Sequence, residues 1–156
     1  MHVEVDTTID RPAEDVFERI TRISEYSSWL PRSIVFTSCR QTSEGPVGPG
    51  TTYEDVTKLG TLRGEVCDLA APTRVAFHET LRWLGRTVME ARIEYALHPD
   101  AAGRTEVHHV AEGELRGAFG LAEPLLAVIA RRERQRTMDA LKRSLETSRD
   151  DPPAAG

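Results

Sequence analysis

Residues 86–115 read RTVMEARIEYALHPDAAGRTEVHHVAEGEL, and this stretch decides the fold class. Polar and apolar side chains alternate from Arg86 to His98 and again from Thr105 to Leu115, which is typical of strands with one buried face. The intervening PDAAG is a turn sequence. We therefore expect two long strands that pair as a hairpin.

Strand patterns continue outward from this hairpin toward the N-terminus. Runs at residues 2–9, 34–42, 51–58, 62–69 and 74–81 are separated in most cases by short turns that contain Gly or Pro. Strands joined by short turns pair antiparallel, because parallel neighbours need long crossover connections. Together with the hairpin, these runs predict a seven-stranded antiparallel sheet.

Two short helices are expected after the first strand. Asp10-Arg11-Pro12 is typical of a helix start, and residues 24–28 have the character of a second short helix that ends before Pro31. The first helix should bury one stripe of apolar residues at helical spacing: Ala13, Val16, Phe17, Ile20 and Ile23.

One long helix is expected at residues 121–146, which contain no glycine and a single proline in the first turn. Its apolar residues at helical spacing predict the stripe that faces the sheet: Leu121, Leu125, Val128, Met138, Leu141 and Leu145. Residues 149–156 have no large apolar side chain, so we expect a disordered tail after one α+β domain of residues 1–148.

The net charge and the two cysteines limit the partners and the cellular compartment that we expect. The formal net charge of −5 argues against a nucleic-acid partner. Cys39 and Cys67 lie in separate strand runs without metal-binding spacing, which favours free thiols in a reducing compartment. Residues 1–6 carry charges where a signal peptide is apolar, and no run is long enough to cross a bilayer. We expect a cytoplasmic protein without stable membrane insertion.

Several segments carry a family resemblance by their order: IDRPAEDVF at 9–17, WLP at 29–31, GPG at 48–50, YALHP at 95–99 and LKRSLE at 141–146. In these segments the chain resembles the START-like or Bet v 1-like superfamily, of the polyketide cyclase/dehydrase type. The resemblance implies a helix-grip fold, in which the sheet wraps the long C-terminal helix and encloses a cavity for lipids, sterols, quinones or polyketides. A minority of members are enzymes, and they share no catalytic motif.

Strand alternation predicts which side chains line this cavity. The inward set would be Phe77, Glu79, Met89, Ile93, Tyr95, Val107 and His109, with Leu125, Val128 and Arg132 from the helix. Tyr53 and Asp55 belong to it if their strand has that phase, but Thr52, Glu54 and Val56 make almost as good an inward set.

His109 and Glu79 are the candidates for acid–base chemistry. His109 would touch the polar end of a ligand, with Glu79 as its first-choice partner and Tyr53 or Arg132 as the others. A core histidine with a neighbouring partner, a solvent-reaching Glu79 and an Arg132 whose head group reaches water are the alternatives. His108 and His109 point to opposite faces of a strand, so no metal site is expected.

Three functions fit the sequence. The first is a carrier that binds a hydrophobic or aromatic small molecule. The second is an enzyme of the cyclase/dehydrase type that uses cavity acid–base residues. The third is an interaction module whose cavity is filled by its own side chains. We expect no cofactor, a hydrophobic small-molecule partner, and a monomer or homodimer.

Overall fold

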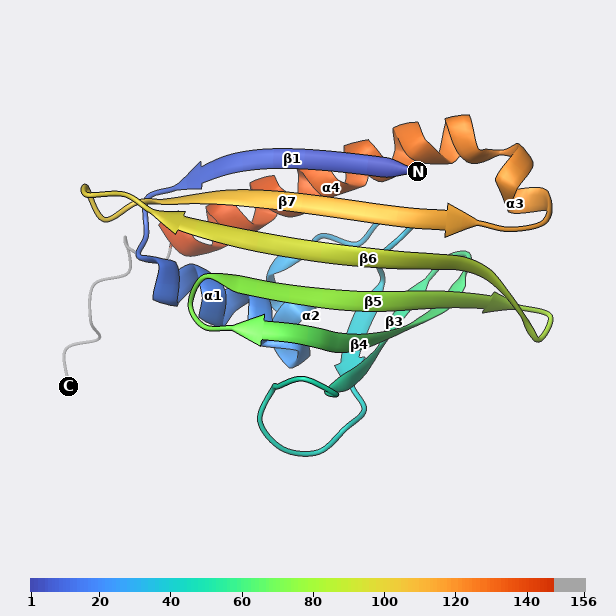
Figure 1. Cartoon of the computed structure of the whole chain (residues 1–156), viewed down its shortest axis with the longest axis horizontal. Helices are drawn as coiled ribbons and strands as arrows, with labels where there is room; N and C mark the ends of the chain where they lie inside the picture. The colour runs from blue at the N-terminus through green and yellow to red at the C-terminus, as the bar shows by residue number, and fades with distance from the viewer. Residues whose placement is uncertain (148–156) are drawn as a thin grey trace.

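An antiparallel sheet curves around a long C-terminal helix, in a computed structural model that describes residues 1–147 (Figure 1). Within these residues the sheet has seven strands in the order β1-β7-β6-β5-β4-β3-β2. The strands are β1 His2–Ile9, β2 Ser38–Gln41, β3 Thr52–Thr57, β4 Gly60–Ala70, β5 Arg74–Trp83, β6 Arg86–Pro99 and β7 Thr105–Leu115. The predicted helix-grip architecture is confirmed.

The helices agree with the sequence in order and differ in detail. They are α1 Ala13–Thr21, the 3-10 turn η1 Ile23–Glu25, α2 Tyr26–Trp29, α3 Ala118–Leu121 and α4 Glu123–Glu146. The short α3 was not expected. It begins just after Gly117, whose positive φ of 63° turns the chain away from β7.

The strand predicted at residues 34–42 is shorter than expected. It forms only at β2, because Ser33 and Phe36 close a turn through a 2.6 Å hydrogen bond from the Ser33 N–H to the Phe36 carbonyl. Ile34 is 48% exposed in that turn. Ile34 is therefore an exposed apolar residue of a turn, and it does not belong to a strand.

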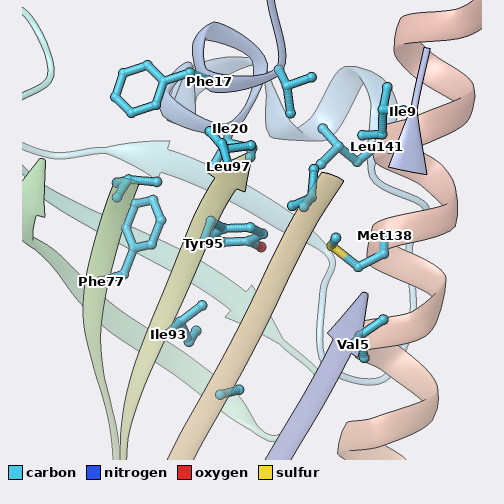
Figure 2. Close-up of a cluster of buried hydrophobic side chains, with 14 of the residues drawn as sticks. Val5, Ile9, Phe17, Ile20, Phe77, Ile93, Tyr95, Leu97, Met138 and Leu141 are labelled. Atoms are coloured by element: carbon cyan, nitrogen blue, oxygen red, sulfur yellow. The ribbon is translucent and has the colours of Figure 1, made fainter. Parts of the chain in front are cut away.

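The best-packed part of the core lies near the β6–β7 hairpin, and we call it the packed end. It consists of Ile9, Val16, Leu97, Val107 and Met138, and each is at most 1% exposed. In Figure 2, Leu97 and Tyr95 project from β6, and Met138 reaches from α4 toward the strands. Ridges of side chains from the sheet, α1 and α4 meet here.

The two halves of α4 differ in burial, which corrects the predicted helix stripe. Met138, Leu141 and Leu145 are buried as expected, but Leu125 is 65% exposed and Val128 is 67% exposed. Counting back from Met138 and Leu141 by helical turns leads to Arg134 and Ala130 instead. The apolar residues Leu125 and Val128 that defined the predicted stripe therefore face outward in the first half of the helix.

Both cysteines are free, as predicted, but only Cys39 is half-buried, whereas Cys67 is exposed. Among residues 1–147, no helix is both long and apolar enough to cross a membrane. The predicted tail at 149–156 lies outside the described residues.

Candidate functional site

A cavity of about 170 Å³ opens between the concave face of the sheet and α4. Its wall is mostly apolar, with side chains from β3, β5, β6, α2 and α4. Seven predicted residues line it: Tyr53, Asp55, Phe77, Glu79, Met89, Ile93 and Tyr95. All seven project from β3, β5 and β6 on the concave face of the sheet.

A tyrosine reaches across one strand to a buried carboxylate. Tyr53, Gly64 and Glu79 are paired in a row across β3, β4 and β5. The Tyr53 hydroxyl donates a 2.8 Å hydrogen bond to Glu79 Oε1. A Cβ on Gly64 would lie 2.0 Å from Cζ of Tyr53, so the ring crosses β4 at a position where only glycine leaves room. Glu79 is 5% exposed.

Asp55 is the second carboxyl group of the cavity, two residues from Tyr53 on the same face of β3. It is 9% exposed, and its Oδ1 atom has no hydrogen-bond partner among the described residues. Burial, followed by repulsion from Glu79, raises the pKa of Asp55 to about 7, which the Cys39 thiol and Arg134 partly oppose. Tyr53 and Asp55 are therefore the inward-facing residues of β3. The alternative inward set of Thr52, Glu54 and Val56 faces away from the cavity, and Val56 is 42% exposed.

Aromatic rings form a row along the concave face, from Tyr53 to His109. Phe77 meets Tyr53 edge to face at 5.9 Å between ring centroids and meets Tyr95 at 6.2 Å. The Tyr95 ring then packs on His109 at 4.4 Å. Burial raises the pKa of Tyr95 to about 12, so its hydroxyl stays protonated and is available as a donor.

His109 faces inward, as strand alternation predicted, but it does not line the cavity. It is fully buried behind Tyr95, and neither ring nitrogen has a hydrogen-bond partner within residues 1–147. The predicted His109–Glu79 pair does not form. Burial, with Arg134 and His108 adding to it, lowers the pKa of His109 to about 3, so the ring is neutral. His108 lies outside and pairs with Asp6 at 2.6 Å.

Val107 and the helix candidates also lie away from the cavity. Val107 belongs to the packed end, while Leu125, Val128 and Arg132 are exposed. Arg134, not Arg132, is the helix arginine that reaches the cavity, because the inward face of α4 is rotated from the predicted one. Its Nη2 atom is 4.0 Å from Glu79 Oε2.

The candidate cavity residues predicted from the sequence did not include aromatic residues of α2 or the small residue Ala91. Trp29 and Tyr26 enter from α2, and the buried Trp29 Nε1 atom has no partner among the described residues. The aromatic content of this short helix was the available signal. Ala91 lines the cavity floor, and small side chains give no pattern that marks them as a wall.

Within the described residues, no group of three or more His, Cys, Asp or Glu side chains is placed to hold a metal ion. The arrangement offers instead a small, mostly apolar chamber with the buried carboxyl groups of Asp55 and Glu79, the Arg134 guanidinium and several aromatic rings. Such a chamber can bind a ligand, hold a proton at Asp55 and orient a polar group beside Glu79.

Comparison with known families gives a match over residues 1–146 to the model described as polyketide cyclase / dehydrase and lipid transport. The chain belongs to this family. A comparison with proteins of curated function found no match.

Solved structures with a similar fold superpose on nearly the whole chain. A START superfamily protein from Mycobacterium smegmatis is 12% identical with a TM-score of 0.71, over 94% of this chain and 97% of that one. Ara h 8.0201 is 10% identical with a TM-score of 0.70, over 94% and 98%.

A third similar structure is the di-domain ARO/CYC BexL from the BE-7585A biosynthetic pathway. It is 16% identical with a TM-score of 0.70, over 97% of this chain and 48% of that one. This chain therefore spans about half of that two-domain protein. At such identities the likeness establishes the fold.

Proposed function

We propose that this protein binds a small apolar or aromatic molecule in the cavity between the sheet and α4. The observation that carries the proposal is the cavity itself, with its apolar wall and few polar groups. Binding sites for small molecules commonly combine these two features. Membership of a family that includes lipid transport supports the same function.

The volume of the cavity limits the size of the ligand that it can enclose. A cavity of about 150 Å³ in another protein accommodates benzene, and this one has about 170 Å³. Sites for drug-sized molecules have roughly 300–1,000 Å³. A ligand with one ring, or a short chain, fits inside, and a longer molecule would extend through the opening.

The test uses 2-phenylethanol as a neutral one-ring probe. We expect amide NMR shifts on titration at cavity residues such as Ile93 and Tyr95, without shifts at Leu97 in the packed end. Ala91→Leu fills the cavity floor and should abolish binding. Ala102→Leu, in the exposed β6–β7 turn, is the matched control. Absence of binding, or equal binding by Ala91→Leu, would contradict the proposal.

Acid–base catalysis is a second candidate, favoured by Asp55. A carboxyl group with a pKa near 7 can donate or accept a proton at neutral pH, which suits general acid–base catalysis. A dehydrating or cyclising site also needs a second polar group, and the Tyr53–Glu79 pair supplies one. Cyclisation of a diketone probe by the wild type but not by Asp55→Asn, followed by mass spectrometry, would support this candidate.

A further inference from the structure

The polar end of the cavity holds two buried carboxyl groups, and one of their oxygen atoms is unpaired among the described residues. Four carboxylate oxygens from Asp55 and Glu79 meet one phenol hydroxyl from Tyr53, the Cys39 thiol and a guanidinium from Arg134. Asp55 lines the cavity, and its Oδ1 atom is buried and has no partner in the described part of the chain. An acceptor left unpaired in a buried site is costly, so the site fits a ligand that brings donors.

The charges at this end are also unbalanced. Two carboxyl groups face a single cation, and Arg134 reaches only Glu79, at 4.0 Å. The other two carboxylates that line the cavity already have partners, since Glu133 pairs with Arg136 at 2.8 Å and Glu112 with His2 at 3.2 Å. In surroundings of low dielectric, like charges repel strongly. The unliganded protein relieves this repulsion by keeping a proton on Asp55.

We propose that the ligand is a small aromatic or alicyclic amine, and that its ammonium group binds between Asp55 and Glu79. This inference rests on the proposed binding function and names the ligand class. An ammonium group supplies three N–H donors, one of which can pair with Asp55, and a positive charge that offsets the excess of carboxyl groups over cations. Tyr53, Phe77 and Tyr95 line the same cavity, and aromatic faces attract cations.

Binding of the amine would take the place of the proton on Asp55. The ammonium group favours the ionised carboxylate, so the proton leaves to solvent as the ligand enters. The titratable and charged groups that act on Asp55 come from five elements: Tyr26 of α2, Cys39 of β2, Tyr53 of β3, Glu79 of β5 and Arg134 of α4. Burial raises the pKa of Tyr26, Tyr53 and Cys39 and keeps all three protonated at neutral pH.

The experiment compares three probes with one phenyl ring and different head groups: 2-phenylethylamine, 2-phenylethanol and 3-phenylpropanoate. Calorimetric titrations at pH 6 and pH 8, each in two buffers of different ionisation enthalpy, give affinity and proton release. We expect the amine to bind at least about tenfold tighter than the alcohol at pH 8. Its affinity should fall about tenfold at pH 6, because Asp55 must first lose a proton there.

The variants assign the effect to Asp55. Asp55→Asn should abolish proton release and reduce the amine's advantage over the alcohol to less than about threefold. Glu65→Gln, on the exposed outer face of β4, is the control and should behave as the wild type.

The outcomes separate the two proposals. Binding of the alcohol or the propanoate as tightly as the amine overturns the amine assignment and leaves the binding function standing. Amine binding without proton release at pH 6 in the wild type also overturns it. Failure of all three probes to bind overturns the binding function together with this inference.

Discussion

The packed end and the cavity end of this molecule lie on one sheet but differ in how their buried side chains are satisfied. At the packed end, Leu97 and Met138 are at most 1% exposed, and they fill the space between β6 and α4. On β3 and β5, Asp55 and Glu79 are almost as buried but have carboxyl groups, and they border the cavity. Apolar packing is therefore concentrated at one end, while the other end keeps buried carboxyl groups, of which Asp55 has an oxygen without a partner among the described residues.

Substitutions in α4 test this contrast with the largest expected effect. Met138→Ala should lower the free energy of unfolding by about 2–5 kcal/mol, because it leaves a void in the packed end. Val128→Ala on the outer face of the same helix should change it by less than about 0.5 kcal/mol. Chemical denaturation measures both. Equal losses would show that the outer face of α4 is covered, or that the helix phase is wrong.

Gly64→Ala should cost about 1–3 kcal/mol, because the new methyl group would overlap the Tyr53 ring and displace it from Glu79. Gly48→Ala is the control, since nothing lies within 4 Å of a Cβ there. In a Tyr53→Ala background the cost of Gly64→Ala should shrink, which a double-mutant cycle detects. An unchanged cost would mean that the clash lies elsewhere.

Asp55→Asn should stabilise the protein at pH 8, by on the order of 1–2 kcal/mol. Asp55 keeps its proton up to about pH 7 when folded, against an ordinary pKa of 3.8. The folded state therefore binds more protons between these values, and the wild type loses stability as pH rises through this window. The variant should lack that loss in thermal melts at pH 4 to 8. A variant that is less stable than the wild type at pH 8 would contradict the burial of a charge.

His109→Phe should have the smallest effect at neutral pH and a visible one in acid. The pKa of His109 is about 3 when folded, against 6.5 ordinarily. The unfolded state binds more protons between these values, so the contribution of His109 is present above pH 6.5 and is lost as pH falls. The variant should shift the midpoint of acid unfolding downward by less than about one pH unit.

The same substitution also tests the corrected site. Because His109 lies behind Tyr95, His109→Phe should leave binding of 2-phenylethanol unchanged. His108→Phe, on the outer face, should leave both binding and the acid midpoint close to those of the wild type. Loss of binding in His109→Phe but not in His108→Phe would show that His109 does contact the ligand.

The sequence was sufficient for the sheet and for the sheet side of the cavity, for a physical reason. Side chains alternate strictly along a strand, so one buried residue such as Phe77 fixes the face of Glu79. A helix has no such parity, and Leu125 and Val128 outweighed Ala130 and Arg134 in apolar character although they face outward. Strand alternation also does not tell whether a neighbouring side chain covers an inward-facing residue. For this reason His109 was predicted to line the cavity, whereas it lies behind Tyr95.

The bridge from Tyr53 over Gly64 to Glu79 has an evolutionary consequence. Three strands contribute one residue each to a single hydrogen bond, and the middle residue contributes only its lack of a side chain. Relatives that carry any larger residue at the position of Gly64 should also have lost the tyrosine, the glutamate or both. The three positions, which are far apart in sequence, are expected to be inherited or replaced as one character, and together they would mark the members that share this chamber.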